Sequence, residues 1–200
     1  MKITSIKQQL RNPNRFSIYV DNKYRFAVSD SELITLGLQV GQTIDKSSLL
    51  KVNSELSLSN AKNACLKLLS YRARSEWEIQ SYLQRKKYDP ITIKQTKEYL
   101  TSKGYIDDSA FARQWIENRL RLKTTSKKFL RFELRQKKVP EGIIEDALSS
   151  LDFDEIEQIR QIIAKKRTIP RFADNLKLMQ YLARQGFDYD KIKQALQPRS

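Results

Sequence analysis

Residues 79–93, IQSYLQRKKYDPITI, and residues 130–144, LRFELRQKKVPEGII, are two copies of one pattern offset by 51 residues. A third copy, MQYLARQGFDYDKI, occupies residues 179–192, another 48 residues along the chain. In each copy, apolar residues at helical spacing precede a turn and a second helical segment. This self-similarity predicts stacked helical repeats. Corresponding residues include Leu83, Leu134 and Leu182; Lys87, Lys138 and Gly186; Tyr88, Val139 and Phe187; and Ile93, Ile144 and Ile192.

Local start and stop signals predict three helices in each copy. In the first copy, an apolar helical face begins at Ala61, and Ser75 with Glu78 forms a capping box that opens a second helix. Asp89 and Pro90 then open a third helix, which ends at Gly104. The first helices of the other copies are predicted within 108–122, DSAFARQWIENRLRL, and 153–166, FDEIEQIRQIIAKK.

Residues 1–50 follow a different pattern. RFSIYV (15–20), DNK (21–23) and YRFAVS (24–29) predict a β-hairpin, and MKITSIKQ (1–8) is expected to add a strand. SDSELITLGL (29–38) predicts a short helix, GQTID (41–45) could add another strand, and KVNSELSLSN (51–60) is expected to be a polar connection.

The predicted fold class is therefore mainly α. We expect an elongated tandem array of three three-helix repeats, preceded by a small β-containing N-terminal module. The expected boundaries are 1–56 for the module, 57–106 for the first repeat, 107–151 for the second and 152–200 for the third.

Composition indicates the class of partner. The net charge of +15 and the pI of about 9.9 favour a polyanion such as nucleic acid, a nucleoprotein or an anionic membrane. No apolar run approaches the roughly 18 residues of a membrane span, and the N-terminus lacks the apolar core of a signal peptide. The single cysteine, Cys65, is expected in the core and fits a reducing cytoplasm.

The absence of histidine excludes most catalytic arrangements. It removes Ser-His-Asp and Cys-His catalysis and histidine-ligated metal sites, and the sequence has no glycine-rich phosphate loop. The acidic pairs Asp107-Asp108 and Glu145-Asp146 lie near expected helix ends, where capping or solvation explains them. We expect no catalytic residue, no metal site and no cofactor.

Residues 119–139, RLRLKTTSKKFLRFELRQKKV, carry nine basic side chains and one acid. Lys127, Arg131 and Arg135 are four residues apart, so they share a helix face on which like charges repel by a few tenths of a kcal/mol per pair. Such a face without nearby acids suggests an anionic partner; the alternative is a solvated helix surface. The residues expected to form the buried stripe are Phe129, Leu130, Leu134 and Val139.

Further candidates flank this stretch. Arg113, Arg119 and Arg121 extend the basic set backward. Arg72 and Arg74 either contact the partner or place positive charge at a helix C-terminus, and these alternatives stay open. The remaining candidates are aromatic or apolar: Trp77 would stack on a base or pack between repeats, Trp115 is expected in the core, and Tyr105 and Ile106 are expected at the joint between repeats.

Three phrases resemble the RecX family, the bacterial regulators of the RecA recombinase. The family phrase R-x-R-S-x-x-E-L corresponds to Arg72, Arg74, Ser75, Glu78 and Ile79. The phrase G-Y-[LI]-[DN]-D-x-x-[FY]-A corresponds to Gly104, Tyr105, Ile106, Asp107, Asp108, Phe111 and Ala112, and E-L-x-x-K-G to Glu133, Leu134 and Lys137. Lys138 stands where the family usually has glycine, and KTTSKK lacks the glycine common before that helix. The resemblance covers about residues 60–197.

The resemblance implies a cytoplasmic, non-enzymatic modulator that binds the RecA nucleoprotein filament and suppresses its recombinase, ATPase and co-protease activities. It also implies weak, non-specific binding to single- or double-stranded DNA; we expect a monomer with no membrane partner. The rivals are a general DNA- or RNA-binding protein and a carboxylate-metal nuclease. The residues expected to contact RecA or DNA are Arg72, Arg74, Arg113, Arg119, Arg121, Lys123, Lys127, Lys128, Arg131, Arg135 and Lys138.

Overall fold

The computed structural model describes residues 1–122, 125–151 and 154–197. Contacts between Cα atoms divide the chain into two compact units. One comprises Met1–Leu68 with Leu83–Tyr99, and the other Leu69–Tyr82 with Leu100–Ser200. The prediction of a mainly helical chain with an N-terminal sheet is confirmed.

The N-terminal sheet has three antiparallel strands in the order β1 (Ile3–Gln9), β2 (Asn12–Val20) and β3 (Lys23–Ser29). Both turn residues between β2 and β3, Asp21 and Asn22, have positive φ (49° and 62°), as the tightest hairpin turns require. The predicted hairpin and the added first strand are therefore confirmed. GQTID contributes only an isolated bridge between Lys2 and Thr43.

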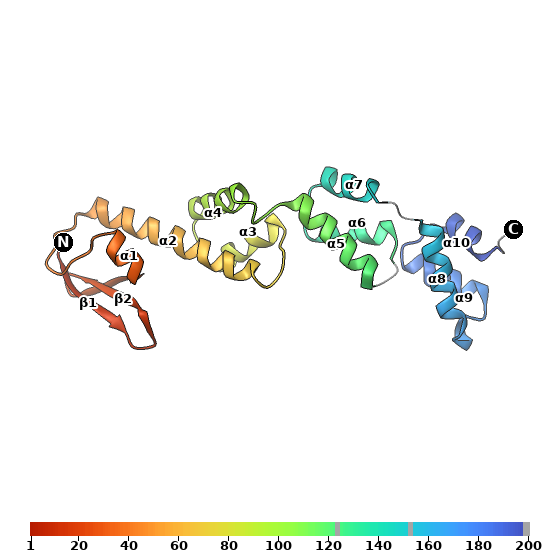
Figure 1. Ribbon diagram of the computed structural model, residues 1–200, viewed down its shortest axis with the longest axis horizontal. Helices are drawn as coiled ribbons and strands as arrows, with labels where there is room; N and C mark the ends of the chain where they lie inside the picture. The colour runs from red at the N-terminus through yellow and green to blue at the C-terminus, as the bar shows by residue number, and fades with distance from the viewer. Residues whose placement is uncertain (123–124, 152–153, 198–200) are drawn as a thin grey trace. The chain divides into compact units, whose positions relative to one another are not determined.

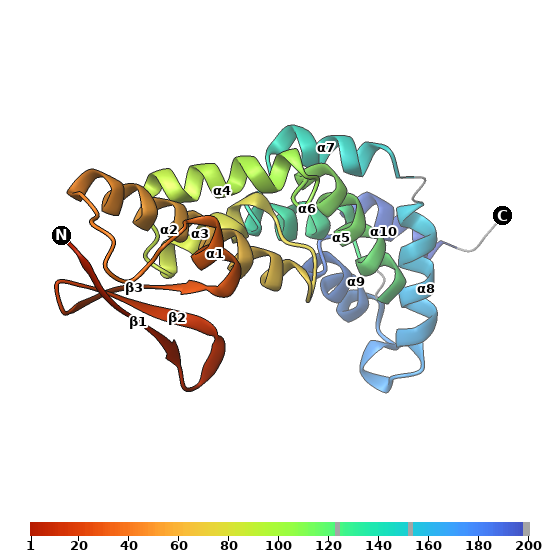
Figure 2. The same cartoon turned by 60° about the vertical axis from the view of Figure 1, so that its left-hand side comes forward.

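Apolar and more exposed residues alternate along the strands, so the apolar side chains gather on one face of the sheet, which is buried. Ile18, Val20, Phe26 and Val28 are buried on that face. Helices α1 (Asp30–Thr35) and α2 (Lys46–Leu69) lie beside the sheet, as Figure 2 shows; Leu49 of α2 belongs to the same hydrophobic core, and Leu33 of α1 packs against it. Helix α1 begins with a complete capping box between Ser29 and Glu32. The sequence prediction of a short capped helix at this position is confirmed.

The expected polar connection at residues 51–60 was wrong, because these residues lie within α2. Leu49, Val52 and Leu56 follow helical spacing and pack against the sheet. The segment contains neither glycine nor proline, so nothing in it ends a helix. In the same unit, Lys62 of α2 places its Nζ 4.3 Å from the ring centroid of Tyr99.

Helices α3 (Glu76–Arg85) and α4 (Pro90–Ser102) begin at the predicted signals. The Asp89 carboxylate accepts a hydrogen bond from the Thr92 amide at 2.9 Å, and Gly104 has φ 70° after α4. Cys65 is fully buried, and this burial raises the pKa of its thiol to about 11. A neutral buried thiol supports the predicted core role of this cysteine.

The second repeat contains α5 (Asp108–Leu122), α6 (Lys127–Gln136) and α7 (Glu141–Ser149), shown in Figure 1. Leu130, Leu134 and Val139 are buried as predicted. The prediction for Phe129 was wrong: it is 38% exposed and lies with its ring centroid 6.3 Å from that of Phe132. The buried stripe is therefore narrower than expected.

The third repeat contains α8 (Glu155–Arg167), the short 3₁₀ helix η1 (Pro170–Phe172), α9 (Asn175–Arg184) and α10 (Tyr189–Leu196). Its core repeats the second one: Leu178, Leu182, Phe187 and Ile192 are buried at the positions of Leu130, Leu134, Val139 and Ile144. The repeat alignment inferred from sequence thus matches the packing.

A buried serine recurs where one repeat meets the next. Ser75 Oγ accepts a hydrogen bond from the Glu78 amide and donates one, at 2.8 Å, to the carbonyl of Lys137, which ends α6. Ser126, 51 residues later, accepts from the Phe129 amide and donates at 2.8 Å to the carbonyl of Gln185, which ends α9. The serine therefore caps its own helix and satisfies a helix-terminal carbonyl of the next repeat.

We call these two contacts, Ser75 with Lys137 and Ser126 with Gln185, the serine joints. A second hydrogen bond recurs at each serine joint. The first residue of α5, Asp108, accepts from the Glu76 amide at 2.8 Å, and the first residue of α8, Glu155, accepts from the Lys127 amide at 2.9 Å. Each carboxylate thus binds the N-terminus of a helix in the preceding repeat, where negative charge is favoured. The predicted capping role of Asp107 is confirmed, because it accepts from the Ser109 and Ala110 amides.

The residue after each helix-ending carbonyl is left-handed: Lys87 has φ 60°, Lys138 φ 55° and Gly186 φ 85°. Lysine therefore replaces glycine without changing the turn. Only at Gly186 is space also limiting, because an added Cβ would lie 2.8 Å from Ser126 Oγ.

Gly186→Ala is therefore expected to lower the free energy of unfolding by about 2–3 kcal/mol, from a left-handed backbone cost of about 1–2 kcal/mol and from the displaced Ser126 hydroxyl. Lys138→Ala is the matched control and is expected to change it by less than about 0.5 kcal/mol, since that lysine already occupies the left-handed region. Urea unfolding measures both. Equal losses in the two variants would contradict a role for the serine joint.

Candidate interaction surface on the second repeat

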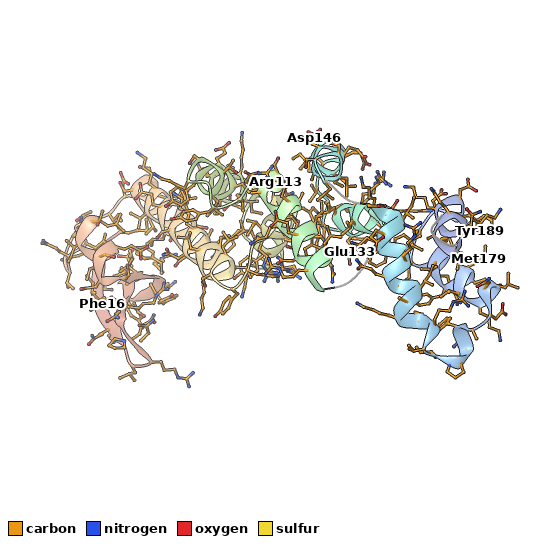
Figure 3. The ribbon with its side chains drawn as sticks, turned by 45° about the vertical axis from the view of Figure 1, so that its right-hand side comes forward. Phe16, Arg113, Glu133, Asp146, Met179 and Tyr189 are labelled. Carbon is orange, nitrogen blue, oxygen red and sulfur yellow. The ribbon has the colours of Figure 1, made fainter. Side chains whose placement is uncertain are left out.

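Four predicted arginines line two adjoining hollows along α5. One hollow, of about 330 Å³, is lined by Arg72, Ala73, Phe111, Gln114, Trp115, Asn118 and Arg119. The other, of about 480 Å³, is lined by Ala73, Arg74, Gly104, Tyr105, Asp107, Ala110, Phe111, Arg113, Gln114 and Glu117. The two share Ala73, Phe111 and Gln114, so we treat them as one groove, the α5 groove, which includes the labelled Arg113 of Figure 3.

Arg72 is held at the rim of the α5 groove by an ion pair. Its guanidinium donates to both carboxylate oxygens of Glu78, at 2.8 and 3.0 Å, and Glu78 also accepts from Lys137 Nζ at 3.0 Å. Burial would raise the pKa of Glu78, but the hydrogen bonds from Arg72 and Lys137 outweigh it and lower the pKa to about 2. The Glu78 backbone amide therefore donates to Ser75 Oγ, while the Glu78 carboxylate binds two cations.

The predicted capping box at Ser75 forms only in part. The Glu78 amide donates to Ser75 Oγ, but the Glu78 carboxylate is turned toward Arg72 and Lys137. Charge-assisted bonds to two cations are stronger than the return bond of a capping box. Arg72 is thus held by Glu78, and its two predicted roles, partner contact and positive charge at a helix C-terminus, stay predictions.

Trp115 forms an apolar wall of the α5 groove between two cations. Its Nε1 donates to Glu133 at 2.9 Å, and Arg119 donates to the same oxygen at 2.8 Å. Arg119 and Lys137 lie over the indole, 4.9 and 5.1 Å from the ring centroid. The tryptophan packs on the edge of the core and is half-buried, so its predicted core position holds for only part of the ring. Glu133 is labelled in Figure 3.

The expectation that the α6 face lacks nearby acids was wrong. Arg131 donates to both oxygens of Glu145 at 2.5 and 2.9 Å, and Arg135 to both oxygens of Glu141 at 2.9 and 2.5 Å. The hydrogen bonds from these arginines lower the pKa of Glu145 and of Glu141. The tight turn at Lys138 folds α7 back beside α6, so acids that follow in sequence neutralise two of the three predicted cations.

The other predicted cations fall into three groups. Arg113, Arg121, Lys128 and Lys138 are exposed and form no ion pair with any residue that the structure describes. Lys127 is half-buried, and its amide lies in the serine joint. Lys123 lies outside the described residues. The structure thus brings Arg72, Arg74, Arg113 and Arg119 together at the α5 groove and leaves Arg121, Lys128 and Lys138 dispersed over α5, α6 and the turn that follows.

Sequence reasoning missed Glu78, Lys137, Gln114 and Asn118 as parts of this surface. The repeat alignment could have identified Lys137, because it places this lysine at the same position as Gln185. Both residues end a helix at a serine joint. Gln114 and Asn118 are four residues apart and share the α5 face with Phe111, a helical spacing that a wider search for polar groups would have found.

Two other aromatic residues have the exposure expected of surface groups. Trp77 is 44% exposed and Tyr105 51% exposed, whereas Ile106 is buried. Tyr105 lines the α5 groove, and the position of Tyr105 and Ile106 at the joint between repeats stays a prediction.

The described residues contain no cluster of three or more histidine, cysteine, aspartate or glutamate side chains arranged to hold a metal ion. Asp107 and Asp108 are both engaged with backbone amides. Among the same residues, no helix has the length and apolarity that a membrane crossing requires.

Comparison with known proteins gives a consistent result along the chain. The model of the regulatory protein RecX N-terminal domain matches residues 1–45. The models of the first, second and third RecX three-helix domains match residues 61–100, 107–148 and 154–196.

Individual relatives agree with these models. The regulatory protein RecX of Clostridium perfringens strain 13 is 32% identical over 94% of this chain and 92% of its own length. That of Bacillus subtilis strain 168 is 27% identical over 97% of this chain and 75% of its own length. A crystal structure titled regulatory protein RecX superposes with a TM-score of 0.69 at 27% identity, covering 96% of this chain and 98% of that one.

Glu78→Gln tests the ion pairs at the rim of the α5 groove. Because the folded-state pKa of about 2 lies below the unfolded value near 4.5, the carboxylate stabilises the fold above pH 4.5 and loses this contribution as pH falls toward 2. The variant should therefore be less stable at pH 7 by about 1–2 kcal/mol, after allowing for solvent screening. The difference should shrink between pH 4.5 and 2.

Thermal unfolding followed by circular dichroism at several pH values measures this difference. Glu117→Gln is the control, since this exposed glutamate lines the same groove without an ion pair to any described residue. A Glu78→Gln deficit that stayed constant from pH 7 to pH 3 would show that the carboxylate charge is not its source.

Proposed function

The chain belongs to the RecX family of regulatory proteins, and on that premise we propose that it regulates the RecA recombinase by binding the RecA–DNA nucleoprotein filament. The bound protein inhibits the recombinase, ATPase and co-protease activities of the filament. It acts without catalytic residues of its own, as a cytoplasmic monomer that binds DNA weakly and without sequence preference.

The observation that supports this proposal most is the order of the four matched domains. They follow one another in order over nearly the whole chain, so the four matched domains account for most of its residues. Neighbouring repeats joined by buried serines form a surface suited to contact several subunits of a polymer.

Two features of the second repeat suit such a partner. The α5 groove combines arginines with an apolar wall at Trp115, which fits a protein side chain inserted between them. The exposed Arg113, Arg121, Lys128 and Lys138 are available to acidic protein surface or phosphate. Bridging successive filament subunits would hinder the subunit movements of ATP turnover; capping a growing filament end is the alternative mechanism.

A second candidate function is general DNA or RNA binding without a RecA role. The net charge of +15 favours it, because a positive surface attracts any nucleic acid. Pull-down of RecA by this protein without DNA separates the two candidates: retention of DNA alone would favour general nucleic-acid binding.

The main test titrates the protein into RecA ATPase and strand-exchange reactions on single-stranded DNA. The variant Arg113→Glu, Arg121→Glu, Lys128→Glu reverses exposed cations that have no described carboxylate partner. It should need about tenfold more protein for half-maximal inhibition, as expected from three weak surface contacts.

The matched control is Lys51→Glu, Lys103→Glu, Lys165→Glu, which makes the same charge change at exposed positions outside the second repeat's α5 and α6. It should inhibit like the unmodified protein. An equal loss in both variants would assign the effect to net charge, and absence of inhibition by the unmodified protein would overturn the proposed function.

A further inference from the structure

A pocket of about 500 Å³ in the third repeat is lined by cations, amides and aromatic rings. It lies between η1 and α9, and its lining residues are Arg171, Phe172, Lys177, Gln180, Tyr181, Arg184 and Gln185. Among the described residues, no carboxylate lines the pocket. Asp174, in the same loop, accepts a hydrogen bond from the Leu176 amide as the cap of α9. We call it the η1 pocket.

The wall of the η1 pocket is an aromatic pair beneath positive charge. The ring centroids of Phe172 and Tyr181 are 5.2 Å apart. Lys166 Nζ lies 5.6 and 5.0 Å from these two centroids, and the Arg171 guanidinium lies 5.8 Å from that of Phe172. The rings pack on the core of the third repeat, so they hold a fixed surface under flexible cations.

Comparison with the second repeat shows what is unusual here. Lys166 and Tyr181 occupy the positions of Arg119 and Glu133, which form an ion pair at 2.8 Å. In the third repeat a tyrosine ring replaces the carboxylate. A ring attracts the lysine without cancelling its charge.

The other neutralising acids are also replaced. Glu141 and Glu145, which bind the α6 arginines, correspond to Tyr189 and Lys193 on α10. Tyr189, labelled in Figure 3, lies under Lys193 with 4.6 Å between Nζ and the ring centroid. All three carboxylates that neutralise arginines within the second repeat are therefore absent from the equivalent positions of the third.

The cations in and beside the η1 pocket have no carboxylate partner among the described residues. Lys166, Arg171, Lys177 and Arg184 form no ion pair within the part of the chain that the structure describes. Arg184 donates its Nε to the Gln180 carbonyl at 3.2 Å, which fixes the side chain and leaves its terminal amino groups for a ligand.

We propose that the η1 pocket binds the backbone of single-stranded DNA, with phosphates held by Arg171, Lys177 and Arg184. Guanidinium groups match phosphate geometry, and Gln180 and Gln185 can hydrogen-bond to base edges. A base against Phe172 and Tyr181 requires an unstacked strand, which excludes a duplex. The choice of DNA over RNA rests on the proposed function; the site itself rests on the lining residues.

The test measures binding of a fluorescent oligo(dT) to the full-length protein by anisotropy, without RecA, over a range of salt concentrations. The variant Arg171→Ala, Lys177→Ala, Arg184→Ala should weaken binding by about tenfold or more at 0.1 M salt. It should also reduce the slope of log K against log salt by about 2, because three phosphate contacts at about 0.7 each are lost.

The matched control is Lys51→Ala, Lys103→Ala, Lys165→Ala, which removes three charges at exposed positions outside the pocket. Both variants lower the net charge from +15 to +12, so an equal loss of binding would overturn the proposal. Circular dichroism verifies that both remain folded.

Photocrosslinking with bromodeoxyuridine oligonucleotides locates the base, and the crosslinked peptide should contain Phe172 or Tyr181. A crosslink confined to the second repeat would overturn the proposal. Loss of RecA inhibition by the pocket variant with unchanged oligonucleotide binding would assign the pocket to an acidic protein surface instead. Tighter binding of oligo(U) than oligo(dT) would overturn the choice of DNA. None of the oligonucleotide measurements requires RecA, so they fail independently of the proposed function.

Discussion

The buried serine at the start of the second helix of a repeat is the contact on which the rest of the structure depends. Its hydroxyl accepts a hydrogen bond from the amide of the third residue of its own helix and donates one to the carbonyl that ends the equivalent helix in the next repeat. A hydroxyl can do both, whereas a carboxylate has no proton to donate at neutral pH. At the corresponding position of the third repeat, the Asp174 carboxylate caps α9 by accepting from the Leu176 amide.

This joint also builds the candidate surface. Because Ser75 binds the Lys137 carbonyl, the lysine side chain lies beside Glu78 and over Trp115. Glu78 in turn orients Arg72 at the rim of the α5 groove. A contact that satisfies helix-terminal groups thereby positions charged side chains from two repeats around one hollow, and the surface needs no loop of its own.

Much of the fold follows from local sequence signals. Helix starts at Asp89 and Ser126, the β-hairpin and the repeat alignment all depend on neighbours within a few residues. The wrong predictions concern residues whose structure depends on packing against segments distant in the sequence. Helix α2 continues through a polar stretch because Leu49 and Leu56 bury against a sheet formed earlier in the chain, and Phe129 is exposed because the packing of α6 leaves that face open.

The role of the basic residues was also difficult to predict, because the acids that bind them lie on other helices. The nine cations of residues 119–139 suggested a binding face, but α7 returns two glutamates to that face, and Glu133 from the same stretch binds Arg119. The third repeat has a less conspicuous basic sequence, yet its equivalent acids are replaced by tyrosines and a lysine. The number of cations left for a ligand therefore depends on which carboxylates the fold places within ion-pairing distance. Comparing equivalent positions of two repeats shows this dependence, because one repeat has the acid and the other has a tyrosine or a lysine in its place.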